Sequence, residues 1–201
     1  MTSLLPYDLQ SLFSRREGAL NSSPAVGSQA PSLPTGIDSW QTQGGPGTLV
    51  AFVRHCGCPF AEEEVKNLIE ASKTNPGLRV VVITHAERDV AENWFREVGR
   101  DDFPSTTHPI LIDDPSTRLY ATWGIGELSW GGLFNLSMLS RLRELASTKG
   151  ISNRKTGKGS QRWQNSGGFA VDRTGKVTWA KVASDAGDTC DYVKAAESLK
   201  A

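Results

Sequence analysis

The chain has 201 residues, a length that suits one ordinary domain and is sufficient to bury a hydrophobic core. Its 22 lysine and arginine residues are balanced by 22 aspartate and glutamate residues, so no net charge favours nucleic acid or an anionic membrane as a partner. We therefore expect a small-molecule substrate or a protein partner, and no nucleic acid.

The sequence also carries no sign of membrane insertion or export. No stretch approaches the roughly 20 apolar residues of a membrane span, and polar residues interrupt the apolar positions of residues 1–20, so we expect neither a membrane anchor nor a secretory signal. Three cysteines are too few for a disulfide scaffold, which predicts a reducing, cytoplasmic setting. They also lack the paired spacing of a structural zinc site, so we expect no metal.

An amphipathic helix is predicted ahead of the main domain, because apolar residues recur there at helical spacing. They are Leu4, Leu5, Leu9, Leu12 and Phe13. We interpret residues 1–25 as a helical arm with a linker, and residues 26–201 as the domain. We expect the helix to pack on the domain; a role in a homodimer or at a membrane surface is the alternative.

Apolar runs and turn signals predict an alternating succession of strands and helices over the domain. The expected strands are residues 48–53, 78–83, 109–112, 168–172 and 176–181. The expected helices are residues 59–72, 87–99, a short helix capped by Asp114 with Pro115 in its first turn, residues 133–148, and a closing helix capped by Asp188 and Thr189 that runs to Leu199. The first crossovers should be parallel and right-handed, and the last two strands should form a hairpin. This order resembles a thioredoxin-like α/β fold, a mixed sheet flanked by helices.

Residues 133–148 follow two glycines and lie outside this succession, so we interpret them as a helical insertion. We expect the insertion to form one wall of a cleft near Cys58. The polar, basic residues 149–162 that come next are predicted to be a solvated and mobile loop.

The chemistry of the sequence is concentrated where a buried strand leads into a helix. Cys58 stands at this point, and Pro59 suits the first position of the helix. A thiol at a helix N-terminus meets unpaired N–H groups and the positive end of the helix dipole, which lower a thiol's pKa and favour the nucleophilic thiolate. We expect Cys58 to be partly accessible, with Arg54 and His55 adding positive charge that residues 62–64, all glutamates, partly offset.

Residues 52–62 resemble the active-site segment of the AhpC/TSA-like (peroxiredoxin-like 2) branch of the thioredoxin superfamily. Other segments are similar to that family's lead-in, its middle strand with a short helix, and its hairpin: residues 26–33, residues 109–115 with 119–120, and residues 167–177. The resemblance covers roughly residues 26–199. It implies a thioredoxin-like fold and an antioxidant, peroxiredoxin-like oxidoreductase with a redox-active cysteine.

Two features of the family's chemistry are missing. Family members often carry a second cysteine three residues after the first, where this chain has Ala61. True peroxiredoxins carry Pro-x-x-x-Thr-x-x-Cys, and here the proline and threonine positions are Ala51 and His55. Cys56 either resolves an oxidised Cys58 through a strained Cys-x-Cys ring or packs as a small apolar residue.

Cys190 is a more distant resolving candidate, and glutathione or another external thiol is the alternative reductant. The sequence thus favours a thiol-dependent oxidoreductase, peroxiredoxin-like or glutathione-linked, without a bound cofactor. Its expected catalytic residues are Cys58, Cys56, Arg54 and His55. The alternative is a scaffold repurposed as a non-redox enzyme or binding protein of specialised metabolism that acts on a bulky apolar small molecule. That alternative stays open because residues 123–130, which contain two tryptophans, and Trp163 suit an apolar pocket.

Overall fold

The computed structural model describes residues 20–34, 40, 45–133, 136–156 and 159–200. Within this part of the chain, one sheet contains five strands in the order β3-β2-β1-β4-β5. They are β1 (Gly47–Phe52), β2 (Arg79–Thr84), β3 (Ile110–Asp113), β4 (Gly167–Asp172) and β5 (Val177–Val182). β1, β2 and β3 pair in parallel, whereas β4 is antiparallel to β1 and β5. The predicted mixed sheet is confirmed, and every strand lies within one residue of its predicted bounds.

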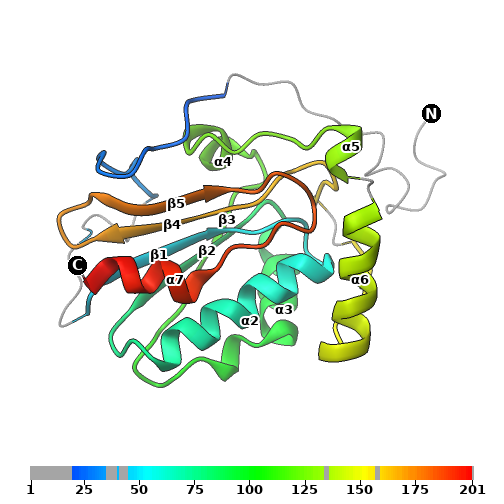
Figure 1. Cartoon of the computed structure of the whole chain (residues 1–201), viewed down its shortest axis with the longest axis horizontal. Helices are drawn as coiled ribbons and strands as arrows, with labels where there is room; N and C mark the ends of the chain where they lie inside the picture. Colours follow the sequence, from blue (N-terminus) through cyan, green and yellow to red (C-terminus); the bar gives the residue numbers. More distant parts are fainter. Residues whose placement is uncertain (1–19, 35–39, 41–44, 134–135, 157–158, 201) are drawn as a thin grey trace.

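Helices cover both faces of the sheet (Figure 1). The α-helices are α2 (Pro59–Lys73), α3 (Arg88–Val98), α4 (Arg118–Thr122), α5 (Trp130–Leu133), α6 (Leu136–Lys149) and α7 (Tyr192–Glu197), and the short 3-10 helices are Arg100–Asp102 and Ser198–Lys200. α2, α3 and α7 lie on one face, and α4 lies on the other. None of the described helices combines the length and apolar character needed to cross a membrane.

The central strands are apolar on both sides because each strand sends alternate side chains to opposite faces of the sheet. In β1, Leu49 and Ala51 belong to the core under α2, α3 and α7. Val50 and Phe52 belong to the core of the other face, where Tyr120 of α4 packs. Both cores exclude water from β1, which explains why its sequence shows an unbroken apolar run.

The short helix α4 begins later than predicted. Its N-cap residue is Thr117 rather than Asp114, although the Asp114 carboxylate still accepts hydrogen bonds from the backbone N–H groups of Arg118 (3.2 Å) and Leu119 (2.8 Å). The helix therefore starts at Arg118 rather than at Pro115, which lies in the turn before it.

The closing helix α7 is also capped by a different residue. Its N-cap is Asp191, whose carboxylate accepts the N–H of Lys194 at 3.0 Å. Asp188 instead accepts the N–H of Ser184 at 2.9 Å and pairs with Lys181, so it stabilises the turn that precedes the helix. The predicted cap at Asp188 and Thr189 is therefore wrong, because the helix is capped further along the chain, at Asp191.

The N-terminal lead-in runs along the hairpin of β4 and β5. The N–H of Gly27 donates to the carbonyl of Val177 at 2.7 Å, and the N–H of Ala30 donates to that of Gly175 at 2.8 Å. These bonds cover the edge of β5, as expected of an extended lead-in. The helix predicted within residues 1–20 falls almost wholly outside the described residues, and the boundary at residue 26 stays a prediction.

Candidate active site

Cys58 is the N-cap residue of α2, in extended backbone conformation (φ −74°, ψ 129°), and Pro59 begins the helix. This is the placement that the sequence predicts. Gly57 precedes it with φ 101°, and a Cβ atom at that position would lie 2.5 Å from the carbonyl oxygen of Lys155. Glycine is therefore required for two reasons: the left-handed backbone and the close approach of the chain segment that covers this turn.

That covering segment belongs to residues 149–162, which the sequence predicts to be a solvated loop. The structure confirms this in part, since residues 152–155 are exposed, but it also shows contacts with the domain. The N–H of Arg154 donates to the carbonyl of Gly57 at 3.0 Å, and its guanidinium donates to Glu62 at 3.0 Å. Ser160 and Gln161 are buried. The loop thus packs over the Cys56–Cys58 turn, a contact between residues almost one hundred positions apart that no local pattern reveals.

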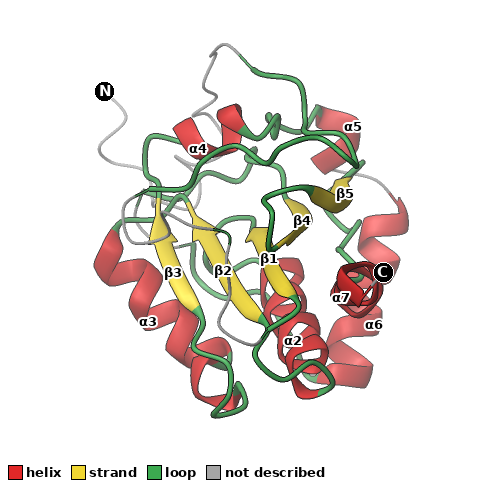
Figure 2. Cartoon of the chain, turned by 90° about the vertical axis from the view of Figure 1, so that its left-hand side faces the viewer, coloured by secondary structure: helices red, strands yellow, loops and turns green. Residues whose placement is uncertain are grey.

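A cavity of about 330 Å³ opens onto Cys58. Its apolar lining consists of Pro59, Phe60, Leu133, Met138, Leu139, Leu142 and Ala186. Its polar lining consists of Arg54, His55, Asn153 and Arg162. Because α5 and α6 supply four of the apolar residues, the predicted insertion does form a wall of the cleft near Cys58. Figure 1 shows α6 beside the N-terminal end of α2, and Figure 2 shows the same two helices from the opposite end of α2.

The thiol is more enclosed than the sequence suggests. Cys58 is only 3% exposed, where partial accessibility was expected. The helix α6 and the loop 149–162 account for the difference, since they contribute Leu139, Leu142 and Asn153 to the lining around it. A molecule that reaches Cys58 must therefore enter the cavity.

Arg54 is the cation beside the thiol. Its Nη1 donates to the Cys58 sulfur at 3.6 Å, and its Nη2 donates to the carbonyl of Arg162 at 2.6 Å. The Arg54 side chain is buried, so it acts on the thiol with little screening by solvent. The guanidinium is thus held by two contacts with its positive charge beside the sulfur of Cys58.

His55 does not supply the second positive charge that the sequence predicts. Burial lowers its pKa well below the usual 6.5, and the charges of Arg54 and Arg162 lower it further. Its Nδ1 lies 3.3 Å from the carbonyl oxygen of Cys56, an arrangement in which neutral imidazole donates through Nδ1. His55 therefore lines the cavity as a neutral ring, and the expectation of a cationic His55 is corrected.

The other two cysteines have different surroundings. All three are free thiols, but Cys56 and Cys190 are not among the residues that line the cavity. The Cys56 sulfur lies 3.3 Å from the hydroxyl of Thr84, and burial raises the pKa of Cys56 to about 11. Burial, with the nearby carboxyl of Glu64, also raises the pKa of Cys190 well above 9.

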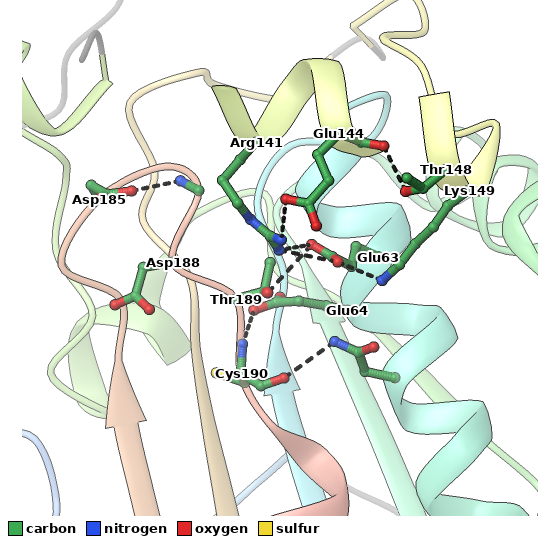
Figure 3. A network of polar contacts seen from close by, with 12 residues as sticks. Glu63, Glu64, Arg141, Glu144, Thr148, Lys149, Asp185, Asp188, Thr189 and Cys190 are labelled. Carbon is green, nitrogen blue, oxygen red and sulfur yellow. Dashed lines mark hydrogen bonds and ion pairs between the residues drawn. The ribbon is translucent and has the colours of Figure 1, made fainter. Parts of the chain in front are cut away.

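The glutamates of α2 do not simply offset positive charge at Cys58, because each is buried against its own partner. Glu62 pairs with Arg154, and Glu63 pairs with Arg141 and Lys149 of α6. Glu64 accepts the backbone N–H of Cys190 at 3.3 Å (Figure 3). The sequence shows three consecutive acidic residues, and nothing local indicates that each of them binds to a different part of the chain.

The tryptophans that the sequence suggests for an apolar pocket do not line the cavity at Cys58, and Trp130 is 61% exposed. Trp123 packs with Phe52 and Phe169 in the core of the α4 face, at ring-centroid distances of 5.4 and 4.8 Å. Trp163 is fully buried and meets Trp130 edge to face at 4.6 Å. The apolar lining of the cavity comes instead from Pro59, Phe60 and Ala186 and from four residues of the predicted insertion in α5 and α6.

Comparison with known proteins agrees with this architecture. The family model of the AhpC/TSA antioxidant enzymes matches residues 64–185, more than half of the chain, so the protein belongs to this peroxiredoxin-like, thioredoxin-fold family. The matched residues begin after Cys58, and the match therefore does not itself assign that thiol. No curated protein matches the sequence.

Solved structures show the same fold at low identity. A peroxiredoxin-like protein from Aquifex aeolicus has a TM-score of 0.55 and 14% identity, covering 90% of this chain and 89% of its own. The thiol peroxidase from Chromobacterium violaceum has a TM-score of 0.55 and 13% identity, covering 90% of each chain. For a mutant of the peroxiredoxin 6 of Arenicola marina the TM-score is 0.51, with 9% identity over 76% of this chain, which spans only 59% of that protein.

Proposed function

We propose that this protein is a thiol peroxidase in which Cys58 is the peroxide-reducing nucleophile and an external thiol is the reductant. The observation that carries the proposal is the position of the Cys58 thiol: at a helix N-terminus, on a cavity, with the Arg54 guanidinium 3.6 Å from its sulfur. The helix N-terminus and the guanidinium place positive charge beside the sulfur, and the cavity gives a substrate access to it. Membership of the AhpC/TSA family supports the same chemistry.

In the first step the Cys58 thiolate attacks the terminal oxygen of a hydroperoxide, so that an S–O bond forms and the O–O bond breaks. Cys58 becomes a sulfenic acid by a two-electron oxidation, and the peroxide is reduced to an alcohol whose oxygen takes up a proton. A thiol then displaces water from the sulfenic acid and forms a mixed disulfide with Cys58. A second thiol attacks that disulfide, which restores Cys58 and releases the oxidised reductant.

The surroundings of the other cysteines favour an external reductant over an internal one. Ala61 stands where a Cys-x-x-Cys motif would place the resolving thiol. Cys56 is buried, has a pKa raised to about 11 and contacts Thr84, so little of it is thiolate at neutral pH. Glutathione or a similar small thiol of a reducing cytoplasm would serve, and no bound cofactor is needed in this scheme.

The proposal is tested by trapping the sulfenic acid. The reduced protein, treated with one equivalent of cumene hydroperoxide in the presence of dimedone, should gain one dimedone adduct, and fragmentation of the peptide should place it on Cys58. The adduct should disappear when excess glutathione is added before dimedone. An adduct on Cys56 or Cys190, or none at all, contradicts the proposal.

A second candidate function is non-redox binding or conversion of a bulky apolar molecule in the same cavity. The aliphatic lining supplied by α5 and α6 favours it. The two candidates separate in the trapping experiment, since the second requires no oxidation of Cys58.

Replacement of Arg54 by methionine should lower kcat/KM for peroxide by about 100-fold, because a preorganised charge beside the reacting sulfur would be lost. Arg54→Lys should lower kcat/KM by less than Arg54→Met does, because lysine keeps the positive charge. Some activity should still be lost, because a lysine cannot reach the Cys58 sulfur and the carbonyl of Arg162 together. Arg173→Met, at the exposed hairpin turn, is the matched control. Steady-state peroxide consumption measures the effect, and an Arg54→Met protein within twofold of wild type would exclude this role.

A further inference from the structure

The helix α6 is held to the domain by a narrow set of contacts. Among its described residues only Met138 and Leu145 are buried, while Leu136 and Leu139 are 85% and 50% exposed. Leu142 also packs against the core, and ionic contacts add to these apolar ones. The side chains of Arg141 and Lys149 both reach the carboxylate of Glu63 (Figure 3).

Glu63 is suited to fix the position of this helix. Its carboxylate accepts two bonds from Arg141 Nη2, at 2.9 and 3.1 Å, and one from Lys149 Nζ at 2.7 Å. Thr189 adds a hydroxyl donor at 3.4 Å. The Glu63 side chain is 3% exposed, so this network is shielded from solvent on its acidic side. One face of α6 carries Arg141, Leu145 and Lys149, because they are spaced four residues apart. On this face the buried Leu145 lies between the two cationic side chains that bind Glu63.

The same helix α2 carries both the anchor and the reactive thiol. Glu63 lies in the second turn of α2, and Cys58 caps its N-terminus. The position of α6 relative to the Cys58 sulfur is thus set through α2 itself. Since Met138, Leu139 and Leu142 of α6 line the cavity, the Glu63 contacts also determine the shape of its apolar wall.

We infer that Glu63 is a positioning residue that holds α6 over Cys58 and thereby selects bulky apolar molecules for reaction with this thiol. Glu63 is not among the residues that line the cavity, and its carboxylate reaches the wall of α6 through Arg141 and Lys149. For hydroperoxides the inference rests on the proposed function. In that case a bulky compound such as cumene hydroperoxide gains binding energy from the wall formed by α6, whereas hydrogen peroxide does not.

Glu63→Gln is the informative variant, because the amide keeps the size of the side chain and removes its charge. Arg141 and Lys149 are 36% and 47% exposed, so solvent can stabilise both once the carboxylate is gone, and no unpaired charge is left buried. We expect KM for cumene hydroperoxide to rise about tenfold, since a displaced wall costs binding and orientation. The value of kcat/KM for hydrogen peroxide should stay within about twofold.

Alkylation of Cys58 gives a second measurement that does not depend on peroxide turnover. In a Cys56→Ser background, Glu63→Gln should speed reaction with the small reagent iodoacetamide severalfold, because a loosened α6 exposes the thiol. The bulky apolar reagent N-phenylmaleimide should gain less or slow down, because the wall that binds it is disturbed. Glu70→Gln, which breaks the exposed pair with Lys73 on the same helix, should change neither rate.

Leu139→Asp tests the wall without touching the anchor, and its exposed position makes it safe for folding. It should raise KM for cumene hydroperoxide more than it lowers kcat/KM for hydrogen peroxide, because both substrates meet the new charge on the cavity but only the bulky one loses an apolar contact. The inference is overturned if Glu63→Gln shifts both peroxides equally or neither, or if Leu139→Asp has no size-selective effect. If the wild-type protein reduces no peroxide while Glu63→Gln still changes the ratio of the iodoacetamide and N-phenylmaleimide rates, the proposed function fails and the positioning role stands. If the wild-type protein reduces peroxide but that ratio is unchanged in Glu63→Gln, only the positioning role is removed.

Discussion

Replacement of Cys58 by serine is expected to lower peroxide turnover by roughly 1000-fold or more, because a serine hydroxyl is not ionised at neutral pH and cannot accept the peroxide oxygen as sulfur does. The exchange is nearly isosteric, so the helix start at Pro59 should be unchanged. Consumption of cumene hydroperoxide with excess glutathione measures the loss, and urea unfolding verifies that the variant is folded.

The matched controls are Cys56→Ser and Cys190→Ser. Serine at position 56 can keep the contact with the Thr84 hydroxyl, and position 190 lies outside the cavity. With an external thiol as reductant, both variants should keep at least about half of the wild-type rate. If Cys56→Ser loses as much activity as Cys58→Ser, resolution runs through the Cys-x-Cys ring and the external-thiol scheme is wrong.

The features that the sequence predicts well are those encoded in short segments. The apolar runs of β1 and β2 follow directly from burial of both faces, and the hairpin follows from Gly175, which adopts φ 86° at its turn. The start of α2 follows from Pro59 in the same way. Hence the sheet, the position of Cys58 and the existence of an inserted helix could all be predicted.

The features that the sequence misses depend on contacts between distant segments. Arg141 and Glu63 are 78 positions apart, and Arg154 and Glu62 are 92 apart. The lowered pKa of His55 also depends on the folded structure. It comes from burial and from the charge of the distant Arg162, as well as from the adjacent Arg54. The cap of α7 fails for a related reason, because several acidic residues near position 190 compete for the role and only the final geometry selects Asp191.

The contribution of Glu64 to protein stability should fall as the pH rises from about 4.5 to about 8. This residue is 1% exposed, and burial raises its pKa from 4.5 to about 8. The hydrogen bond from Cys190 and the charge of Arg54 oppose that shift without cancelling it. The carboxyl of Glu64 is therefore protonated in the native protein at pH 6, although it would be ionised in the unfolded chain.

The sign of the effect follows from this difference in bound protons. Between the unfolded pKa of 4.5 and the native pKa of about 8, the native state holds a proton that the unfolded state has released. The contribution of Glu64 to the free energy of unfolding must then decrease with rising pH across this window, by an amount on the order of 5 kcal/mol in total. The stabilisation is complete below pH 4.5 and is lost as pH rises through about 8.

Glu64→Gln isolates this contribution, because the amide cannot ionise yet its oxygen can still accept the N–H of Cys190. Urea unfolding from pH 5 to pH 9 should give nearly equal stabilities for the variant and wild type at pH 5. Above pH 8 the variant should be the more stable protein. Taking the difference between the two curves removes the opposite contribution of His55, whose lowered pKa costs stability as the pH falls below 6.5.

The exposed Glu70→Gln variant provides the reference, and its difference from wild type should be flat across the same range. If the Glu64→Gln curve instead runs parallel to that of wild type, Glu64 is already ionised at pH 5 in the native protein. That result would mean that the charge of Arg54 outweighs the cost of burial at Glu64. Arg54 would then be shared between this carboxylate and the Cys58 sulfur, and its support of the thiolate would be weaker than the geometry at Cys58 alone indicates.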